Sequence, residues 1–350
     1  DLGLLDPFLA LPHQRVSQLS ANVYGQVVTI ADFTHLNTRC PYLVLMPQWD
    51  FLDFVARHAR AYPHFHLRMG TRATGVIEGD GRIVGVRADT RGEAVEIHCE
   101  LAVAADGRHT TLREAAGLAV EDLGAPMDVL WFRLPRAPGD VAQTGGYVRR
   151  GLFLVAINRD TYWQCGYVIP KGSHEDLKAA GLDALKANVR ECAPFLGDAL
   201  AELQTWEDLK LLAVQVSRLP RWYRDGLVCI GDAAHPMSPV GGVGINLAIQ
   251  DAVAAANLLA EPLRDGQLQA AHLAALQRRR DWPTRVTQRM QIAVQNELLA
   301  PVLAGEGKPA ATPPSMPLAL QVLRRLPMLS RIPARMVGLG VRPERVRTAR

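Results

Sequence analysis

The chain has 350 residues, of which 48% are hydrophobic and 21% charged, so it has the composition of an ordinary globular protein with two or three domains. This balance excludes a fully disordered chain, a collagen-like fibre and a disulfide scaffold. The net charge of +4 and the 6% content of aromatic residues argue against a nucleic-acid-binding protein. No run of 18 apolar residues occurs, so no membrane span is expected.

The five cysteines are far apart in the sequence and form no CxxC pair. We therefore expect neither a metal site nor a disulfide framework, and a reducing cytoplasm is the compartment that this pattern favours. The cysteines are Cys40, Cys99, Cys165, Cys192 and Cys229. The chain starts at Asp1 without a signal-peptide pattern, and we expect it to begin inside a longer protein.

The first 125 residues mix short strand patterns with two helices. Strands are predicted at Gly25–Phe33 and Tyr42–Met46, and a helix at Gln48–Ala61. Residues 66–100 predict a meander of strands, because Asp80-Gly81 and Arg91-Gly92 separate β-branched runs. The wholly apolar Leu101–Ala105 predicts a strand buried on both faces, and residues 111–117 predict a helix.

The rest of the chain predicts an antiparallel sheet and then helices. Four strands are expected within 129–169, an amphipathic helix at Asp176–Val189, and strands at Leu211–Ser217 and Gly226–Ile230. The strongest helix is Asn246–Ala260, with Ile249, Val253, Ala256 and Leu259 on one face. Residues after 262 are helical and Arg-rich, and 305–317 predict a loop.

The segment Leu227–Ala252 holds the densest set of chemically useful residues. A buried strand leads to Gly231-Asp232, and a glycine-rich turn at 239–244 opens onto a helix. Glycines let a backbone approach a planar ligand, and the first N–H groups of a helix favour an anion or a partly negative ring edge. Asp232 could accept hydrogen bonds from sugar-like hydroxyls. Gly242-Val243-Gly244 lacks the third glycine of GxGxxG, so it is not a dinucleotide fingerprint.

Two shorter segments add candidates. Asp106-Gly107 follows a buried strand, and Thr110 and Arg113 follow the aspartate at +4 and +7. Arg113 in the first turns of a helix could hold a phosphate, although a helix cap and a solvated charge are the plain alternative. Gln48 follows Pro47 at a helix start, where a surface glutamine is the plain alternative.

Together these segments resemble the FAD-dependent aromatic-hydroxylase superfamily, the single-component flavoprotein monooxygenases. The family motif DGxxSxxR is met by Asp106, Gly107, Thr110 (for Ser) and Arg113. The motif GDAAHxxxPxxGxGxNxAxxDA is met by Gly231, Asp232, Ala233, Ala234, His235, Pro239, Gly242, Gly244, Asn246, Ala248, Asp251 and Ala252. Order and spacing agree over roughly residues 40–262, with Pro47-Gln48 as the third element.

The resemblance implies an α/β fold: an incomplete FAD/NAD(P)-binding Rossmann-like domain interleaved with an antiparallel-sheet substrate domain, and a helical C-terminus. We assign 38–124 and 219–262 to the first domain, 20–37 and 125–218 to the second, and 263–350 to the helical region with its basic tail. The family begins with a strand, GxGxxG and a helix, which this chain lacks. We therefore expect an N-terminal segment to be missing and FAD binding by this chain alone to be weak.

The resemblance also implies an activity: an NAD(P)H-dependent FAD monooxygenase that hydroxylates an aromatic or polycyclic, lipophilic molecule with O2 through a C4a-hydroperoxyflavin. FAD is expected to contact Gln48, Asp106, Gly107, Arg113, Gly231, Asp232, Pro239, Gly242, Val243, Gly244, Ile245 and Asn246. Substrate is expected beside the antiparallel sheet, against Trp131, Tyr147, Phe153, Trp163 and Tyr167. No catalytic side chain and no metal ligand is assigned; His235 is either a base or, as is commoner in this motif, structural.

Other interpretations stay open. A reductase of isoprenoid double bonds would carry Y-x-W-x-F-P-K, which residues 165–171 only echo because Cys165 replaces the first aromatic residue. The spacing of Trp163 and Ile169-Pro170 does not match the WxWxIP motif of flavin halogenases. A non-catalytic truncated fragment is the third alternative. The last twenty residues carry six Arg and one Glu, and form either a solvated tail or a contact with an anionic membrane.

Overall fold

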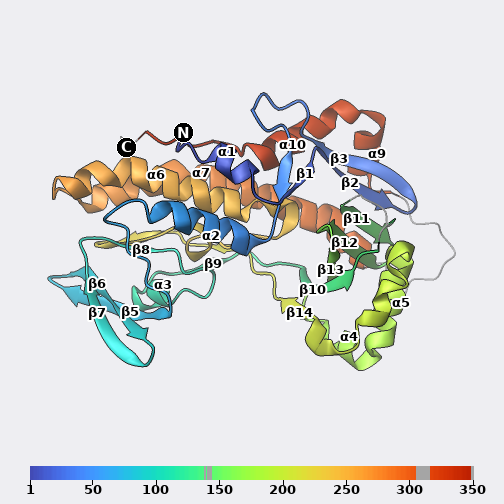
Figure 1. Cartoon of the computed structure of the whole chain (residues 1–350), viewed down its shortest axis with the longest axis horizontal. Helices are drawn as coiled ribbons and strands as arrows, with labels where there is room; N and C mark the ends of the chain where they lie inside the picture. Colours follow the sequence, from blue (N-terminus) through green and yellow to red (C-terminus); the bar gives the residue numbers. More distant parts are fainter. Residues whose placement is uncertain (138, 140–143, 305–315, 348–350) are drawn as a thin grey trace.

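The computed structural model describes residues 1–137, 139, 144–304 and 316–347. The long helices α6 (Gly244–Arg264) and α7 (Ala270–Val294) run across the molecule between a seven-stranded sheet at one end and the three-stranded meander β5–β7 at the other (Figure 1). The two chain ends lie close together, and Val346 N donates to Asp1 Oδ2 at 3.1 Å. The predicted α/β architecture with a helical C-terminus is confirmed.

The large sheet joins strands from distant parts of the chain. Its order is β14 (Lys210–Leu212), β10 (Met127–Pro135), β13 (Tyr162–Pro170), β12 (Leu152–Asn158), β11 (Gly145–Arg149), β2 (Gln18–Val23) and β3 (Gln26–Asp32). All neighbours are antiparallel except β11 and β2, which are parallel. The four strands expected within 129–169 are confirmed, and so is the strand over 25–33.

The two faces of this sheet contact different parts of the molecule, because successive side chains of a strand point to opposite faces. Leu130, Leu154 and Trp163 face the helix α5 (Leu182–Cys192) and form the largest hydrophobic core. Trp131 and Phe153 point the other way and pack in a cluster that contains Val240 and Ile292. This second face therefore looks toward the glycine-rich turn.

The helix expected at Asp176–Val189 is broken in two. α4 (His174–Ala180) ends and α5 begins at Gly181, whose φ of 95° and ψ of 159° are open to glycine alone. The expected strand over 211–217 is also two pieces, β14 and β15 (Ser217–Arg218); β15 pairs with β9 (Glu121–Asp122).

A small sheet carries the two aspartate motifs. β8 (Ala102–Ala104) lies parallel to β17 (Leu227–Cys229), which is antiparallel to β16 (Tyr223–Arg224). The strand predicted at 101–105 forms, but burial on both faces was wrong: Val103 is 44% exposed while Ala102 and Ala104 are buried.

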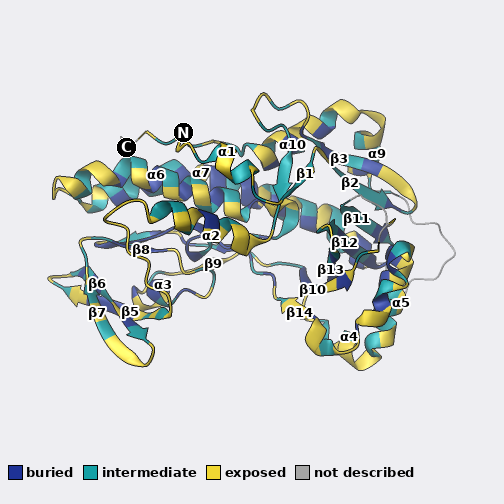
Figure 2. Cartoon of the chain, in the orientation of Figure 1, coloured by how far each residue is buried: buried dark blue, intermediate teal, exposed yellow. Residues whose placement is uncertain are grey.

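The meander predicted at 66–100 is confirmed as β5 (Thr71–Gly79), β6 (Arg82–Thr90) and β7 (Glu93–His98). Its turns need positive φ, which Asp80, Gly81, Arg91 and Gly92 all adopt. Figure 2 shows α2 (Gln48–Ala59) and β7 as largely exposed elements, and much of the buried surface around the large sheet and α7.

The remaining elements surround these parts. They are α1 (Leu5–Leu9), β1 (Gln14–Val16) paired with β4 (Leu43–Leu45), α3 (Thr111–Ala115), a π-helical turn η6 (Gln295–Leu299), α8 (Ala300–Leu303), α9 (Leu318–Arg325) and α10 (Arg331–Gly338). Short 3-10 turns are η1 (Pro194–Leu196), η2 (Ala199–Glu202), η3 (Trp206–Asp208), η4 (Gly231–Ala233), η5 (Val240–Gly242) and η7 (Pro327–Ser330). Most of the loop predicted at 305–317 lies outside the described residues. α9 and α10 pack on β3, so the C-terminal region covers the sheet.

The helix predicted at Asn246–Ala260 extends in both directions, as α6, and passes through Pro262. The apolar face noted in the sequence is not the face that is buried, because Ile249 is 42% exposed while Leu247, Asp251 and Ala254 are buried. By length and composition alone the stretch Val240–Arg264, which contains an 18-residue window of mean hydropathy 1.4, could cross a membrane. Here α6 packs against α7 and buries the charged Asp251, which is the arrangement of a core helix.

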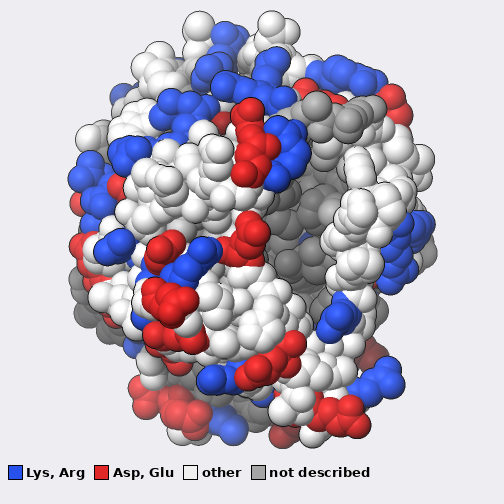
Figure 3. All heavy atoms as spheres, turned by 90° about the vertical axis from the view of Figure 1, so that its left-hand side faces the viewer, with Lys and Arg blue, Asp and Glu red and all other residues white. Residues whose placement is uncertain are grey.

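Surface charge is mixed. On the face shown in Figure 3, basic side chains are frequent toward the top and acidic ones toward the bottom, with both signs interspersed. This distribution is that expected of a chain whose net charge is only +4.

Asp128 of β10 joins the large sheet to the segments that follow β13 and β14. Its carboxylate accepts from Lys171 Nζ at 2.8 Å, Val214 N at 2.9 Å and Gly172 N at 3.0 Å. Burial alone would raise the pKa of Asp128, but Lys171 and the two backbone N–H groups outweigh it and hold the pKa below its usual value.

Replacing Asp128 by Asn should lower the free energy of unfolding at pH 7 by roughly 1–3 kcal/mol, because the buried N–H of Val214 and the partly buried N–H of Gly172 lose a charged acceptor. A depressed carboxyl pKa stabilises the fold above the unfolded pKa of about 4, and this contribution is lost as pH falls through the folded pKa. Urea titrations at pH 7 and pH 3 should show a gap between wild type and Asp128→Asn that narrows at pH 3. A gap that widens in acid would contradict this assignment.

Candidate functional site

The parallel strands β8 and β17 bring the two aspartate motifs to one edge. Ala104 lies opposite Cys229, and Ile230 N donates to Ala104 O at 3.0 Å. Both strands therefore end side by side, with Asp106 after one and Asp232 after the other. Their carboxyl ends form the kind of edge at which open α/β sheets bind ligands.

The turn after β17 is shaped by a glycine. Gly231 has a φ of 57°, and a Cβ atom there would lie 3.0 Å from the Cβ of Ala248 on α6. The turn η4 therefore presses directly onto α6. Asp232 next to it is half-buried, and its carboxylate has no hydrogen bond or ion pair within the described part of the chain.

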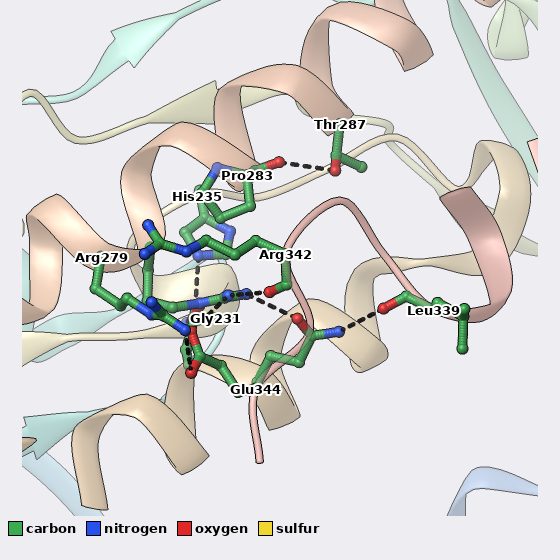
Figure 4. A network of polar contacts seen from close by, with 11 residues as sticks. Gly231, His235, Arg279, Pro283, Thr287, Leu339, Arg342 and Glu344 are labelled. Atoms are coloured by element: carbon green, nitrogen blue, oxygen red, sulfur yellow. Dashed lines mark hydrogen bonds and ion pairs between the residues drawn. The ribbon is translucent and has the colours of Figure 1, made fainter. Parts of the chain in front are cut away.

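A buried network of hydrogen bonds and ion pairs holds the turn at Gly231 in place (Figure 4). Asp251 Oδ2 accepts from Gly231 N at 3.0 Å and from His235 Nε2 at 2.6 Å. Arg280 Nε donates to Asp251 Oδ1 at 2.8 Å, and both side chains are fully buried. Burial alone would raise the pKa of Asp251, but His235 and Arg280 hold it below its usual range. His235 is 1% exposed and bound to Asp251, so it acts as a structural residue here.

The network continues into the C-terminal segment. Arg280 Nη1 donates to Arg342 O at 3.2 Å and lies 3.4 Å from Glu344 Oε1. Glu344 also receives two hydrogen bonds from Arg279, at 2.6 and 3.0 Å. Gln250 Nε2 donates to Leu339 O at 3.4 Å. Residues more than 100 positions apart in sequence therefore hold the turn at Gly231 (Figure 4).

Three buried glutamines of α7 and η6 hold the segment that leads to the glycine turn. Gln288 Nε2 donates to Ser217 O at 2.7 Å, and Gln291 Nε2 donates to Ser238 O at 2.9 Å and Val240 O at 2.8 Å. Gln295 Nε2 donates to Ser238 Oγ at 2.9 Å. Our reading of the sequence missed them, although their i, i+3, i+7 spacing places three amides on one helix face.

The glycine turn leaves open space in front of α6. Gly241 and Gly242 have φ values of 78° and 63°, and a Cβ atom at Gly242 or Gly244 would meet nothing within 4 Å. No side chain caps the start of α6. The first N–H groups of the helix, at Gly244 to Asn246, therefore point their partial positive charge into this space.

The segment that follows Asp106 contains a second group that could bind an anion. Thr110 Oγ1 caps α3 by accepting from Arg113 N at 3.1 Å, and Asp106 Oδ2 accepts from Leu112 N at 3.4 Å. Arg113 is 6% exposed, and its Nε has no hydrogen-bond partner among the described residues. Burial, and then the charge of Asp106, raises the pKa of Cys229 to about 12, while Arg113 lowers it, so both charges lie near the end of β17.

Gln48 lies at the start of α2 on the rim of a large pocket of about 770 Å³. Its wall toward the sheet includes Trp131, Arg133 and Tyr162. The full lining is Met46, Pro47, Gln48, Trp49, Trp131, Phe132, Arg133, Arg159, Tyr162, Gln164, Glu202, Leu203, Glu207, Asp208 and Lys210. This volume is in the range of pockets that hold drug-sized ligands.

Of the five aromatic residues expected beside a substrate, Trp131 is the one in the lining of this pocket. Trp163 and Tyr167 do not line it, in contrast to the expectation, because they are buried on the opposite face of the sheet, against α5. Tyr147 packs on that same core beside Phe195, with ring centroids 5.2 Å apart. Phe153 shares the face of Trp131 but packs in the cluster with Val240. The register of β10 and β13 decides this division, since Trp131 pairs with Gly166 and Leu134 with Trp163.

Comparison with known protein families identifies the ligand class for the edge formed by the ends of β8 and β17. A family model described as an FAD binding domain matches residues 1–290. The chain belongs to this FAD-binding family. The resemblance that the motifs indicated is therefore confirmed.

Members and structural neighbours of the FAD-binding family share the fold. The chain is 32% identical over 280 residues to 6-methylpretetramide 4-monooxygenase from Streptomyces rimosus, covering 79% of this chain and 66% of that protein. It covers 49% and 61% of two further relatives, so it spans about half to two thirds of the length of these curated relatives. Anhydrotetracycline hydroxylase OxyS from Streptomyces rimosus superposes with a TM-score of 0.70 at 21% identity, covering 96% of this chain and 64% of that chain. A flavin-dependent brominase superposes with a TM-score of 0.75 at 18% identity, over 97% and 80%.

The described residues fit the flavin half of FAD. Open space at Gly242 and Gly244, an uncapped helix start, an unpartnered carboxylate at Asp232 and an orphaned buried Nε at Arg113 are what a flavin ring, its hydroxyl chain and a phosphate require. The sequence contains no GxGxxG loop, which in dinucleotide-binding folds holds the pyrophosphate.

Proposed function

We propose that the protein is an FAD- and NAD(P)H-dependent monooxygenase that hydroxylates an aromatic or polycyclic small molecule. The observation that carries the proposal is the common edge of β8 and β17, where Asp106 follows one strand and Asp232 the other, and where the turn that holds Asp232 packs on α6, whose start is open. The name of the relative 6-methylpretetramide 4-monooxygenase supports the same reaction class and a polycyclic substrate. The five free thiols support a reducing, cytoplasmic location.

Each side chain of the edge has a role in this proposal. When bound, FAD would supply the redox chemistry, which is acceptance of a hydride from NAD(P)H and activation of O2. Asp232 would accept hydrogen bonds from the ribityl hydroxyls, and Arg113 would pair with a phosphate. The N–H groups of Gly244, Ile245 and Asn246 would stabilise negative charge at the ring edge. The face of the large sheet with Trp131 and Phe153 would exclude water.

Asp232→Ala should weaken FAD binding by about 10- to 150-fold, since it removes a charge-assisted hydrogen bond worth roughly 1.5–3 kcal/mol. Asp106→Ala should cost less, because Oδ2 of Asp106 is already engaged by Leu112 N at 3.4 Å. Titration of the full-length protein with FAD, followed by quenching of flavin fluorescence, measures both. Equal affinities for wild type and Asp232→Ala would remove Asp232 from the site.

The activity is tested by following NAD(P)H oxidation and O2 uptake together. A monooxygenase should oxidise NAD(P)H faster when an aromatic substrate is added, with matching O2 consumption. Turnover of an isoprenoid alkene under anaerobic conditions, with no stimulation by aromatic compounds in air, would instead favour the reductase. No flavin-dependent turnover of either kind would favour a non-catalytic protein.

A further inference from the structure

The pocket beside Gln48 is lined by two arginines, the exposed Arg133 and the half-buried Arg159, and neither forms an ion pair with a carboxylate of the described residues. Arg159 Nε donates to Gln164 Oε1 at 3.0 Å, while its Nη1 is buried and has no acceptor within the described part of the chain. Arg133 lies with its guanidinium 4.9 Å from the ring centroid of Tyr162. A half-buried guanidinium with an unused N–H is costly unless a ligand satisfies it.

The two guanidinium groups are close enough to interact. Burial is the main cause that lowers the pKa of Arg159; Tyr162 acts in the opposite direction, and the charge of Arg133 lowers the pKa further. Their mutual repulsion is relieved most directly by an anion placed between them. Both residues lie at the same end of the sheet, because Arg133 and Gln164 are register partners and Arg159 N donates to Tyr162 O at 2.8 Å.

The carboxylates of the pocket do not supply this anion. Asp208 accepts from the backbone N–H groups of Gln204 and Thr205, at 3.1 and 2.9 Å. Glu202 and Glu207 are exposed and form no ion pair with either arginine. The third cation of the lining, Lys210, donates to the carbonyl of Glu207 at 2.9 Å.

Aromatic rings form the adjoining walls. Trp49 and Tyr162 line the pocket, and so does Trp131, whose ring lies over Gly166. A Cβ atom at Gly166 would lie 3.0 Å from that ring, so the glycine lets Trp131 lie flat on the strand. Flat aromatic walls favour a planar ligand through ring stacking.

We propose that this pocket binds a planar aromatic compound that carries an anionic oxygen, as carboxylate, phenolate or enolate, and that Arg133 and Arg159 hold that oxygen. The inference rests on the proposed function and names the substrate class for it. Guanidinium groups bind such oxygens through two parallel hydrogen bonds, which also fix the orientation of the ring. The aromatic walls then hold the ring system at the sheet.

The test compares a charged probe with a neutral one of the same shape. Binding of 2-anthracenecarboxylate and 2-anthracenemethanol is measured at pH 7.5 by energy transfer from protein tryptophan, without FAD or NAD(P)H. The wild-type protein should bind the carboxylate about 10-fold more tightly than the alcohol, or better. Arg159→Gln and Arg133→Gln should each reduce this ratio toward one and leave the affinity for the alcohol unchanged.

Two further variants keep the result interpretable. Arg159→Lys retains the charge without the paired donors and should give an intermediate ratio. Arg325→Gln, at an exposed arginine of α9, should leave the ratio unchanged. Melting temperatures identify any variant that fails to fold, and the remaining arginine variant then decides. Equal affinity for both probes in the wild type, binding of neither probe, or a ratio that survives in both Gln variants overturns the proposal. Because no cofactor is present, failure of the oxygenase activity would leave this discrimination intact.

Discussion

Replacing Arg280 by Ala is expected to lower the free energy of unfolding by about 3–5 kcal/mol. Arg280 and Asp251 are both 0% exposed and are joined at 2.8 Å, so the variant leaves a buried carboxylate with His235 as its remaining side-chain partner. A buried charge without its partner costs far more than a surface ion pair gains. Urea unfolding, followed by tryptophan fluorescence, measures the loss.

Arg279→Ala is the matched control. Arg279 precedes Arg280 on the same helix and binds the same Glu344, at 2.6 Å, but its side chain is 27% exposed. Its loss should therefore cost clearly less, since water can reach the site. An Arg280→Ala protein as stable as Arg279→Ala would show that the buried network does not hold the Gly231 turn.

Gly226→Ala should be similarly damaging, at about 3–6 kcal/mol, from backbone strain and steric overlap together. Gly226 has a φ of 80°, and a Cβ atom there would lie 1.8 Å from Ile83 O, inside the backbone of β6. Two backbone hydrogen bonds prevent easy relaxation: Ile83 N donates to Asp225 O at 2.8 Å, and Ala102 N donates to Gly226 O at 2.9 Å.

Gly81→Ala is the control that separates backbone strain at positive φ from steric overlap of the new Cβ atom. Gly81 has a similar φ of 76°, but a Cβ atom there would meet nothing within 4 Å. This control should cost only about 1–2 kcal/mol, the price of a left-handed alanine. Thermal unfolding of both variants at one pH gives the comparison, and equal losses would argue that the approach of Gly226 to β6 is not close in solution.

Local chemistry made much of the fold predictable. The turns at Asp80-Gly81 and Arg91-Gly92 require positive φ, and those residues supply it. The break at Gly181 was missed because an amphipathic pattern continues across it, and only its φ of 95° ends α4. The prediction that Val103 is buried was wrong, because a short apolar run does not reveal that one face of β8 is exposed to solvent.

The site was predictable where its residues are neighbours in sequence and not where they meet through tertiary contacts. The motifs around Asp106 and Asp232 mark strand ends that the structure brings to one edge. Strand register, which places Trp131 in the pocket and Trp163 in the core, is set by pairing and not by residue type. The bond network from Glu344 through Arg280 to Asp251 joins residues 29 to 64 positions apart, and no local pattern signals it.

The most direct measurement of the central claim is the origin of the oxygen in the product. Full-length protein with FAD and NAD(P)H is supplied with ¹⁸O2 and hydroxylated polycyclic aromatic acids, and products are weighed by mass spectrometry. We predict that the product contains one ¹⁸O atom that the substrate lacked. The amount of this product should be much lower with Asp232→Ala than with wild type. A product with oxygen from water, or a reduced alkene formed without O2, would contradict a flavin-dependent monooxygenase built on this edge.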